Sequence, residues 1–366
     1  MELEVTQEKL NKALSVVSKV AVGGRSTLPI LSNVLIRCDG GKVSLVTTNL
    51  DMAVIDYLPT LSAKDGVVTV PARVLAEFVS NLPRGEKVSL KTEGIKVKLA
   101  AGKYTSTMNG VAADDFPELP EMDEKKAVKF SMGVDEFKTG LAEVIVAASN
   151  DTTRPALTGV FFSTRDNTLF IAATDGYRLT ERRFVENVKS EVKAIVPASA
   201  MQEVMRSLGD ETDEIEMIFE ESQARFRFGE IEVISKLIDG SYPSFHELIP
   251  KDTEVKIVVD RAELMRMVKM ARVFSSVSDG VISLEVKDQS LVVSSISNEL
   301  GENESETPAE TVGTGKKSFS ARYMMDALNS MEEDRVRIGF DNNSTQVVMK
   351  NEKSDNYTHV VMSLVR

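Results

Sequence analysis

The feature that most constrains the fold is a helix-and-strand unit of about 120 residues that the sequence repeats three times. An amphipathic helix start at Val5 returns at Val134 and at Val259, which gives spacings of 129 and 125 residues. A second marker, a strand end followed by a helix start, keeps spacings of 126 and 123 residues. It stands at Val70, Val196 and Phe319. Two independent markers that keep one period predict a structural repeat.

The spacing of apolar residues predicts two helices and two hairpins in every unit. The first helices are expected at 5–21, 134–148 and 259–272, and the second helices at 74–82, 201–208 and 323–331. Alternating apolar and polar residues around short polar turns predict antiparallel strand pairs. Three pairs follow the first helices (33–37 with 42–47, 160–163 with 168–172, 281–286 with 290–294), and three follow the second helices (88–91 with 95–99, 214–219 with 224–228, 335–340 with 346–349). The fold class is therefore α+β, with three repeated domains that each pack two helices on antiparallel sheets.

Proline and charged residues mark two linkers between the units. The first linker is Pro117–Lys126 and the second is Pro250–Glu254. A chain of 366 residues has room for two or three cores, because a single core rarely grows past about 250 to 300 residues. We therefore expect domains at 1–124, 125–252 and 253–366.

Cysteine and histidine are scarce, which restricts both the compartment and the chemistry. Cys38 is the only cysteine, so an intrachain disulfide is excluded, as is usual in a reducing compartment. It ends an apolar stretch and is interpreted as a buried small side chain. His246 and His359 are far apart and form no zinc signature. No apolar run reaches the roughly 18 residues of a membrane span, and the acidic start Met1–Glu4 is unlike a signal peptide. These features predict a cytoplasmic protein without a metal or a cofactor.

The net charge of the chain and the charge on two of its expected helices favour different partners. The net charge is −12, from 44 basic and 56 acidic residues, which argues against nucleic acid as a partner of the chain as a whole. Two of the expected first helices nevertheless carry cations on a face away from their apolar residues. These cations are Lys9, Lys12 and Lys19 in one helix and Arg266, Lys269 and Arg272 in the other. From the residues alone, an ordinary solvated face and a face that meets DNA phosphates are equally good interpretations.

Motifs for catalysis are missing from the sequence. It holds no phosphate-binding loop, no dinucleotide fingerprint and no zinc-protease pattern. Asp114 and Asp115, together with Asp51 or Asp56, form the one acidic set that a metal-dependent nuclease would need. No equivalent set recurs in the other repeats, so a protein without catalytic residues is expected and a nuclease is the rival hypothesis.

Six segments carry a resemblance to a known family. In chain order they are Gly24–Asn33, Thr69–Arg73, Ala113–Pro117, Arg154–Val160, Ala173–Leu179 and Ser235–Pro243. They resemble the motifs of the bacterial sliding clamp, the β subunit of DNA polymerase III, in the family's order and from end to end. The Thr-Asp-Gly-Tyr-Arg-Leu sequence at 174–179 is specific in this context.

The resemblance implies a DNA-clamp architecture, a ring-shaped homodimer closed head to tail, with helices lining the hole and sheets outside. Such a ring would encircle duplex DNA, hold its phosphates loosely and act as a processivity factor without catalytic chemistry. The implied DNA contacts fall on Arg25, Arg73 and Arg154, to which the basic helix faces add Lys9, Lys12, Arg266 and Lys269. The implied dimer interface combines an edge strand at Tyr104, Ser106 and Met108 with a helix end at Val273 and Phe274.

The resemblance also implies an apolar cleft, between the second and third domains, that binds a short peptide of the replicative polymerase, the clamp loader and other partners. The matching positions are Leu157, Thr174, Gly176, Tyr177, Arg178, Leu179, Pro243, Leu248, Tyr323, Val360, Val361 and Met362. Three features depart from the family pattern: the ending Ser363–Arg366, Glu247 where some members carry arginine, and Asn343–Ser344 near a usual valine. The peptide preference is therefore not predicted. A monomeric adaptor that binds peptides but not DNA is a further alternative.

Overall fold

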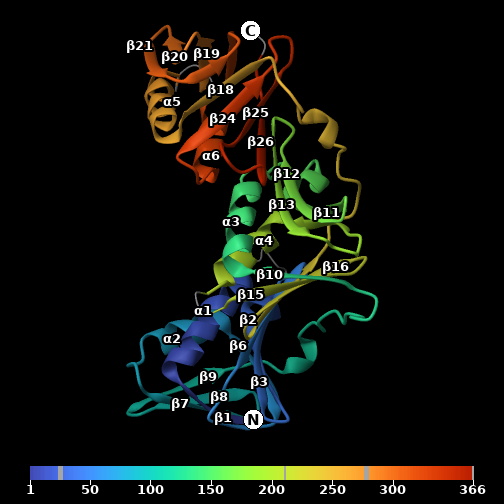
Figure 1. Cartoon of the computed structure of the whole chain (residues 1–366). Coiled ribbons are helices and arrows are strands. Elements are labelled where there is room, and N and C mark those ends of the chain that lie inside the picture. Colours follow the sequence, from blue (N-terminus) through green and yellow to red (C-terminus); the bar gives the residue numbers. More distant parts are fainter. Residues whose placement is uncertain (24–27, 210–211, 276–279, 365–366) are drawn as a thin grey trace. The chain divides into compact units, whose positions relative to one another are not determined.

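The computed structural model describes residues 1–23, 28–209, 212–275 and 280–364 (Figure 1). Within these residues the chain forms six α-helices and 26 β-strands. The chain packs into two compact units. Unit 1 comprises Met1–Val134 and Ser199–Leu237, and unit 2 comprises Asp135–Ala198 and Ile238–Arg366. The middle third of the sequence contributes to both units, and the division into three repeated domains stays a prediction.

Unit 1 contains two antiparallel sheets. Their strand orders are β5-β1-β7-β8-β9 and β10-β15-β16-β17-β4-β3-β2-β6. The first sheet consists of β1 (Glu2–Thr6), β5 (Ser62–Lys64), β7 (Lys87–Glu93), β8 (Lys96–Ala101) and β9 (Tyr104–Asn109). The second consists of β2 (Asn33–Asp39), β3 (Lys42–Thr48), β4 (Met52–Leu58), β6 (Gly66–Pro71), β10 (Val128–Gly133), β15 (Glu214–Phe219), β16 (Gln223–Phe228) and β17 (Ile231–Lys236). The pairing of β17 with β4 joins the two chain segments of the unit.

The helices of unit 1 bury the apolar faces that the sequence predicts. They are α1 (Gln7–Gly23), α2 (Ala72–Ser80) and α4 (Ala198–Ser207) from Ser199 onward, with short 3-10 turns η1 (Pro29–Ser32) and η2 (Ala113–Asp115). Leu10, Leu14 and Val17 are buried where α1 packs on β3 and β4. The Thr47 hydroxyl donates to the carbonyl oxygen of Val17 at 2.6 Å, which fixes the helix on the sheet.

Unit 2 also contains two antiparallel sheets. Their strand orders are β14-β11-β12-β13-β26-β25-β24-β18-β22 and β21-β20-β19-β23. The larger sheet consists of β11 (Gly159–Arg165), β12 (Thr168–Thr174), β13 (Arg178–Glu186), β14 (Lys193–Pro197), β18 (Val255–Asp260), β22 (Glu310–Val312), β24 (Arg335–Phe340), β25 (Gln346–Asn351) and β26 (Tyr357–Met362). The smaller consists of β19 (Val281–Lys287), β20 (Ser290–Ser297), β21 (Gly301–Pro308) and β23 (Gly315–Ser320). The pairing of β13 with β26 makes one continuous sheet from residues far apart in the chain.

The helices of unit 2 follow the same packing rule. They are α3 (Val134–Ile145) from Asp135 onward, α5 (Arg261–Ser275) and α6 (Ala321–Ser330), with the turns η3 (Pro155–Thr158) and η4 (His246–Leu248). On α5, Leu264, Val268 and Ala271 are fully buried, as the helical periodicity predicts. The Ser295 hydroxyl donates to the carbonyl oxygen of Ala271 at 2.7 Å.

The predicted hairpins are confirmed, whereas the helix boundaries differ by a few residues. All six expected strand pairs form antiparallel ladders. Gly40 and Gly41 form one of the turns with positive φ angles, and Asp166 and Asn167 do the same in another. The second helices begin two or three residues earlier than expected, at Ala72, Ala198 and Ala321. Among the described residues, no helix has both the length and the apolar content that a membrane crossing requires.

The end of α3 was predicted too late. The helix ends at Ile145 rather than near Ala148. The N–H groups of Ala147 and Ala148 donate to carbonyl oxygens only three residues back, which is turn geometry. The first helix and α5 instead run beyond their expected ends, to Gly23 and Ser275.

Candidate functional site

The turn between β12 and β13 is fixed by its own polar side chains. The Thr174 hydroxyl donates to the carbonyl oxygen of Arg178 at 2.6 Å and accepts from the N–H of Gly176 at 3.1 Å. Asp175 Oδ1 accepts from the N–H groups of Tyr177 at 2.9 Å and Arg178 at 3.0 Å. Gly176 has a φ of +91°, which glycine adopts without steric cost. The turn therefore holds its shape and leaves the Tyr177 side chain 62% exposed.

Arg178 connects this turn to helix α6. Its side chain is only 4% exposed, and its guanidinium pairs with two carboxylates. Nη1 lies 2.5 Å from Asp326 Oδ2, and Nε lies 3.1 Å from Asp175 Oδ2. The guanidinium carbon also lies 4.6 Å from the centre of the Tyr323 ring. Two carboxylates and an aromatic face offset the cost of burying the cation and make a rigid wall.

An apolar cluster lies where β13 meets β26. It contains Ala172, Leu179, Phe245 and Val360, with Phe161, Tyr242, Ile249 and Val348 packed around them. Leu179 stands opposite Val360 in the strand register. The rings of Phe161 and Tyr242 stack with centroids 4.6 Å apart. We expect this cluster to form the floor of the predicted cleft, because an apolar floor beside a few fixed polar groups suits a short peptide.

The residues predicted at the rim of the cleft lie in three separate segments of the chain. Leu157 is buried in η3, whereas Pro243 and Leu248 are exposed near η4. The N–H of Met362 donates to the carbonyl oxygen of Tyr177 at 2.8 Å, which brings the end of β26 against the cleft turn. Leu364 is 45% exposed just beyond that end, and sequence reasoning did not include it.

Two residues predicted in the cleft have a different role. Val361 is fully buried in the core on the opposite face of β26, because successive side chains of a strand point to opposite faces. It supports the strand and does not line the cleft. Thr174 is also buried, and its hydroxyl is used within the turn.

A buried polar network lies behind β26, and sequence reasoning missed it. Tyr357 Oη lies 2.7 Å from His359 Nδ1 and 3.2 Å from the carbonyl oxygen of Glu143. Both contacts are satisfied when the imidazole donates from Nδ1 and the hydroxyl donates to the carbonyl. Burial lowers the pKa of His359 to about 3, which keeps the ring neutral. Burial also raises the pKa of Glu143 to about 7, although Arg182 lies 2.9 Å away. The network therefore holds β26 in place with little net charge.

The predicted DNA-contacting cations of unit 1 lie on helix surfaces. Lys9, Lys12 and Lys19 are exposed along α1, away from its buried apolar face. Arg73 is exposed in the first turn of α2. Arg25 lies outside the described residues.

The predicted DNA-contacting cations of unit 2 lie partly on a helix and partly outside one. Arg266 and Lys269 are exposed on α5, and Arg266 pairs with Glu263 at 2.8 Å. Arg154 is exposed immediately before η3. A side chain at Gly176 would begin 3.5 Å from the Arg154 guanidinium, so Arg154 lies beside the cleft turn.

The residues predicted at the dimer interface lie on a sheet edge and a helix end. Strand β9 is the last strand of its sheet, which confirms the expected edge. Tyr104 is exposed and Ser106 half-buried, but Met108 is buried within unit 1. At this edge, the groups available for pairing with another chain are therefore those of the backbone, not the Met108 side chain. At the end of α5, Val273 is exposed and Phe274 half-buried.

The acidic residues of the nuclease hypothesis do not converge. Asp114 and Asp115 are exposed in η2, and Asp51 is exposed at the start of β4. Asp56 is buried on β4, where burial and the nearby Glu230 raise its pKa to about 6. In the part of the chain that the structure describes, no group of three or more His, Cys, Asp or Glu side chains is arranged to hold a metal ion.

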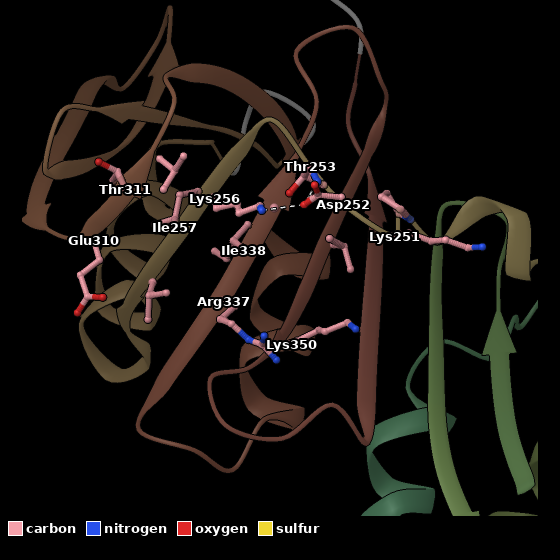
Figure 2. A pocket seen from close by; sticks show the side chains of 15 residues that line it. Lys251, Asp252, Thr253, Lys256, Ile257, Glu310, Thr311, Arg337, Ile338 and Lys350 are labelled. Atoms are coloured by element: carbon pink, nitrogen blue, oxygen red, sulfur yellow. Dashed lines mark hydrogen bonds and ion pairs between the residues drawn. The ribbon is translucent and has the colours of Figure 1, made fainter.

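A further pocket of about 430 Å³ lies over β18, β22 and β24 of unit 2 (Figure 2). Lys256 pairs with Asp252 at 2.7 Å across its upper part. Arg337 and Lys350 both pair with Asp355, at 2.7 and 3.4 Å. Three of the four cations that line this pocket, Lys256, Arg337 and Lys350, are therefore paired with carboxylates. None of the predicted site residues lines it.

Three family descriptions match the chain in order. The N-terminal domain of the DNA polymerase III beta subunit matches residues 1–120, the central domain matches 131–244 and the C-terminal domain matches 246–365. The chain belongs to this family, the bacterial sliding clamps.

Known sliding clamps resemble this one over almost its whole length. The beta sliding clamp of Staphylococcus aureus is 29% identical over 357 residues, which are 94% of each chain. The crystal structure of the DNA polymerase III beta subunit of Pseudomonas aeruginosa has a TM-score of 0.94 at 26% identity and covers all of both chains. A second Pseudomonas aeruginosa structure, bound to griselimycin, has a TM-score of 0.94 at 27% identity with the same coverage. The sliding-clamp fold expected from the sequence is therefore confirmed.

Proposed function

We propose that two copies of this sliding clamp close head to tail into a ring around duplex DNA and tether the replicative polymerase through the cleft of unit 2. The observation that carries the proposal is the end-to-end match to the three beta-subunit domains. A ring linked to DNA by topology does not need to grip it, so loose and sequence-independent phosphate contacts suffice. The clamp itself performs no catalytic step and works where bacterial DNA lies, in the cytoplasm.

Opposite charges on two sheet edges support the head-to-tail contact. Lys96 on β8 and Lys103 in the turn before β9 are exposed near the free edge of β9. Glu302, Glu304 and Glu306 are exposed on β21, the free edge of the smaller sheet of unit 2. The basic β9 edge of one chain is therefore attracted to the acidic β21 edge of another. Two β9 edges, or two β21 edges, repel each other. Two such unlike contacts related by a two-fold axis close a dimeric ring.

The basic helix faces support DNA as the content of the ring. Lys9 and Lys12 of unit 1, and Lys269 of unit 2, are exposed on the first helices of their repeats. A chain of net charge −12 that concentrates cations on these faces suits contact with phosphates through one surface only.

The cleft supports a peptide partner. The apolar floor around Leu179 and Val360 provides an anchor site for an apolar side chain, and the Arg178 wall provides polar groups at its edge. A Pseudomonas aeruginosa clamp is known in complex with griselimycin, and we propose that the cleft of this clamp takes up such ligands as well as peptides of the polymerase and the clamp loader. Glu247 and Ser363 make its rim differ from the family pattern.

Light scattering on charge-reversed variants tests the ring. The wild type is expected at twice the chain mass of 40.2 kDa. Lys96→Glu with Lys103→Glu, and separately Glu302→Lys with Glu304→Lys, should each give monomers, because both edges of one chain then carry the same sign. An equimolar mixture of the two variants should restore a dimer, since each contact again joins opposite charges. A monomeric wild type at micromolar concentration would support the adaptor alternative, and dimers unaffected by either reversal would place the interface elsewhere.

A further inference from the structure

The cleft turn of unit 2 has a counterpart in unit 1. The Thr48 hydroxyl donates to the carbonyl oxygen of Met52 at 2.9 Å and accepts from the N–H of Leu50 at 3.1 Å. Asn49 Oδ1 accepts from the N–H groups of Asp51 at 3.0 Å and Met52 at 2.8 Å. These four bonds join the same backbone positions as the four bonds of the cleft turn. The two turns therefore have the same framework.

The strands beside the two turns are equivalent as well. Ala53 on β4 stands opposite Ile234 on β17, as Leu179 stands opposite Val360 in the cleft. The N–H of Lys236 donates to a carbonyl oxygen of the turn at 2.9 Å. The corresponding bond in unit 2 brings the end of β26 to the cleft turn at 2.8 Å. Unit 1 thus contains the strand and turn arrangement that forms the floor and one wall of the cleft.

A groove of about 340 Å³ opens at this place in unit 1. Its lining includes Leu50, Met52, Pro117, Leu119, Ile234 and Lys236. Ile234 belongs to a buried apolar cluster, and Leu119 packs against that cluster from the linker. The groove therefore has an apolar floor, as the cleft has.

Leu50 adopts an unfavourable backbone conformation at the rim of the groove. Its φ is +77°, a region that L side chains rarely occupy. The equivalent residue of the cleft turn is Gly176, at a φ of +91°. Leu50 is nevertheless 44% exposed, so its side chain gains little from burial in unit 1. A strained, exposed and apolar residue beside a groove indicates a contact with something outside the unit.

The linker that contributes Pro117, Glu118 and Leu119 to the groove is rich in acidic residues. Residues 113–124, which include the lining residues Pro117, Glu118 and Leu119, hold six acidic side chains, and Lys125 and Lys126 follow them directly. Two of the six carboxylates are already paired, Asp123 with Lys126 and Glu124 with Lys129 and Arg227. The equivalent linker beside the cleft, residues 239–250, holds two acidic side chains. Glu118 lines the groove and is exposed. Lys236 is the one cation of the lining, and Asp51 lies 3.9 Å from it. The charge favours a basic partner.

We propose that this groove is a second partner site, which binds a short extended peptide that presents one large apolar side chain flanked by lysines or arginines. The apolar side chain occupies the floor between Leu50 and Ile234, and the basic residues face the acidic linker. The linker beside the cleft of unit 2 has fewer acidic residues, so the two sites select different peptides.

Fluorescence anisotropy with labelled decapeptides tests the second site. The probe carries a central Leu-Phe pair with two lysines on each side, and matched probes carry glutamates in place of the lysines or alanines in place of the Leu-Phe pair. The full chain should bind the lysine probe at least about tenfold more tightly than either matched probe. Leu50→Ala should weaken this binding about fivefold, and Leu50→Gly should do the same while raising the melting temperature, because it relieves the positive φ.

Two control variants test whether the lysine probe binds at the groove and not elsewhere on the chain. Leu61→Ala changes another exposed leucine of unit 1 and should leave the affinity unchanged. Met362→Ala changes the rim of the cleft and should also leave it unchanged, whatever happens to peptides of the cleft. The proposal is overturned if no probe binds at millimolar concentration, or if Met362→Ala abolishes binding while Leu50→Ala does not. It is equally overturned if Leu50→Ala abolishes self-association instead, since the occupant is then a second copy of the chain.

Discussion

The segment 48–56 of unit 1 and the segment 174–182 of unit 2 share the hydrogen-bonded framework of their turn but differ in most side chains. Both begin with a threonine whose hydroxyl closes the turn, followed by an Asx side chain that accepts two N–H groups. Leucine stands at the third position in one and glycine in the other. The comparison teaches that the first two side chains fix the framework of the turn, whereas the side chains at the later positions can differ without changing it.

The fifth position separates the two segments most clearly. In unit 2 it is Arg178, which is buried between two carboxylates and the Tyr323 ring. In unit 1 it is Met52, a half-buried apolar residue of the groove. The cleft wall therefore depends on a charge network, and the groove wall depends on packing.

Arg178→Ala is expected to have the largest effect. It leaves Asp175 and Asp326 without their cation and should reduce the free energy of unfolding of unit 2 by about 3 kcal/mol. Met52→Ala, the matched change in unit 1, should cost about 1 kcal/mol. Urea denaturation followed by circular dichroism measures both. Arg178→Lys keeps the charge but loses the planar guanidinium that contacts both carboxylates, and it should fall between the wild type and the alanine variant. Equal costs for the two alanine variants would contradict the contrast between a charged and a packed wall.

The ninth position carries ionisable groups of opposite sign in the two segments, a half-buried arginine in unit 2 and a buried aspartate in unit 1. In unit 2, Arg182 pairs with the buried Glu143 at 2.9 Å. In unit 1, Asp56 is buried near another carboxylate, Glu230, and burial is the first cause of its raised pKa of about 6. The positive charge of Lys12 lowers the pKa of Asp56, but by less than burial raises it.

Asp56→Asn should therefore change the pH dependence of stability. A carboxyl whose pKa is raised on folding, here from 3.8 to about 6, stabilises the fold fully below pH 3.8 and loses that contribution as the pH rises through 6. The wild type is thus penalised at pH 8, where the asparagine variant is not. The variant should gain on the order of 2 kcal/mol relative to the wild type between pH 4 and pH 8. Thermal melts at both pH values measure this difference. A constant difference would show that Asp56 does not titrate in this range.

Local features of the fold were predictable because short-range chemistry determines them. Gly40 and Gly41, and likewise Asp166 and Asn167, mark tight turns between alternating strands, and these hairpins formed as predicted. The buried face of α5 followed from the spacing of Leu264, Val268 and Ala271. The cleft residues came from the resemblance to sliding clamps, not from periodicity.

Features that depend on long-range contacts were not predictable in this way. The pairing of β13 with β26 joins Leu179 to Val360, and no local pattern specifies that partner. The network of Tyr357, His359 and Glu143 exists only once that pairing has formed. The sequence does contain a signal from which the turn beside the groove could have been predicted. Thr48 and Thr174 are 126 residues apart, the same spacing as that of the second repeat marker.

Retention on DNA of defined topology tests the central claim most directly. The clamp would be loaded by a bacterial clamp loader onto a nicked circular plasmid, separated from free protein by gel filtration at high salt, and filtered again after a restriction enzyme has linearised the plasmid. A ring that encircles the duplex stays on the circle at high salt and slides off the linear form. Equal retention on both forms would contradict the topological link, and so would equal loss from both when salt is raised, since the clamp would then be held by charge alone.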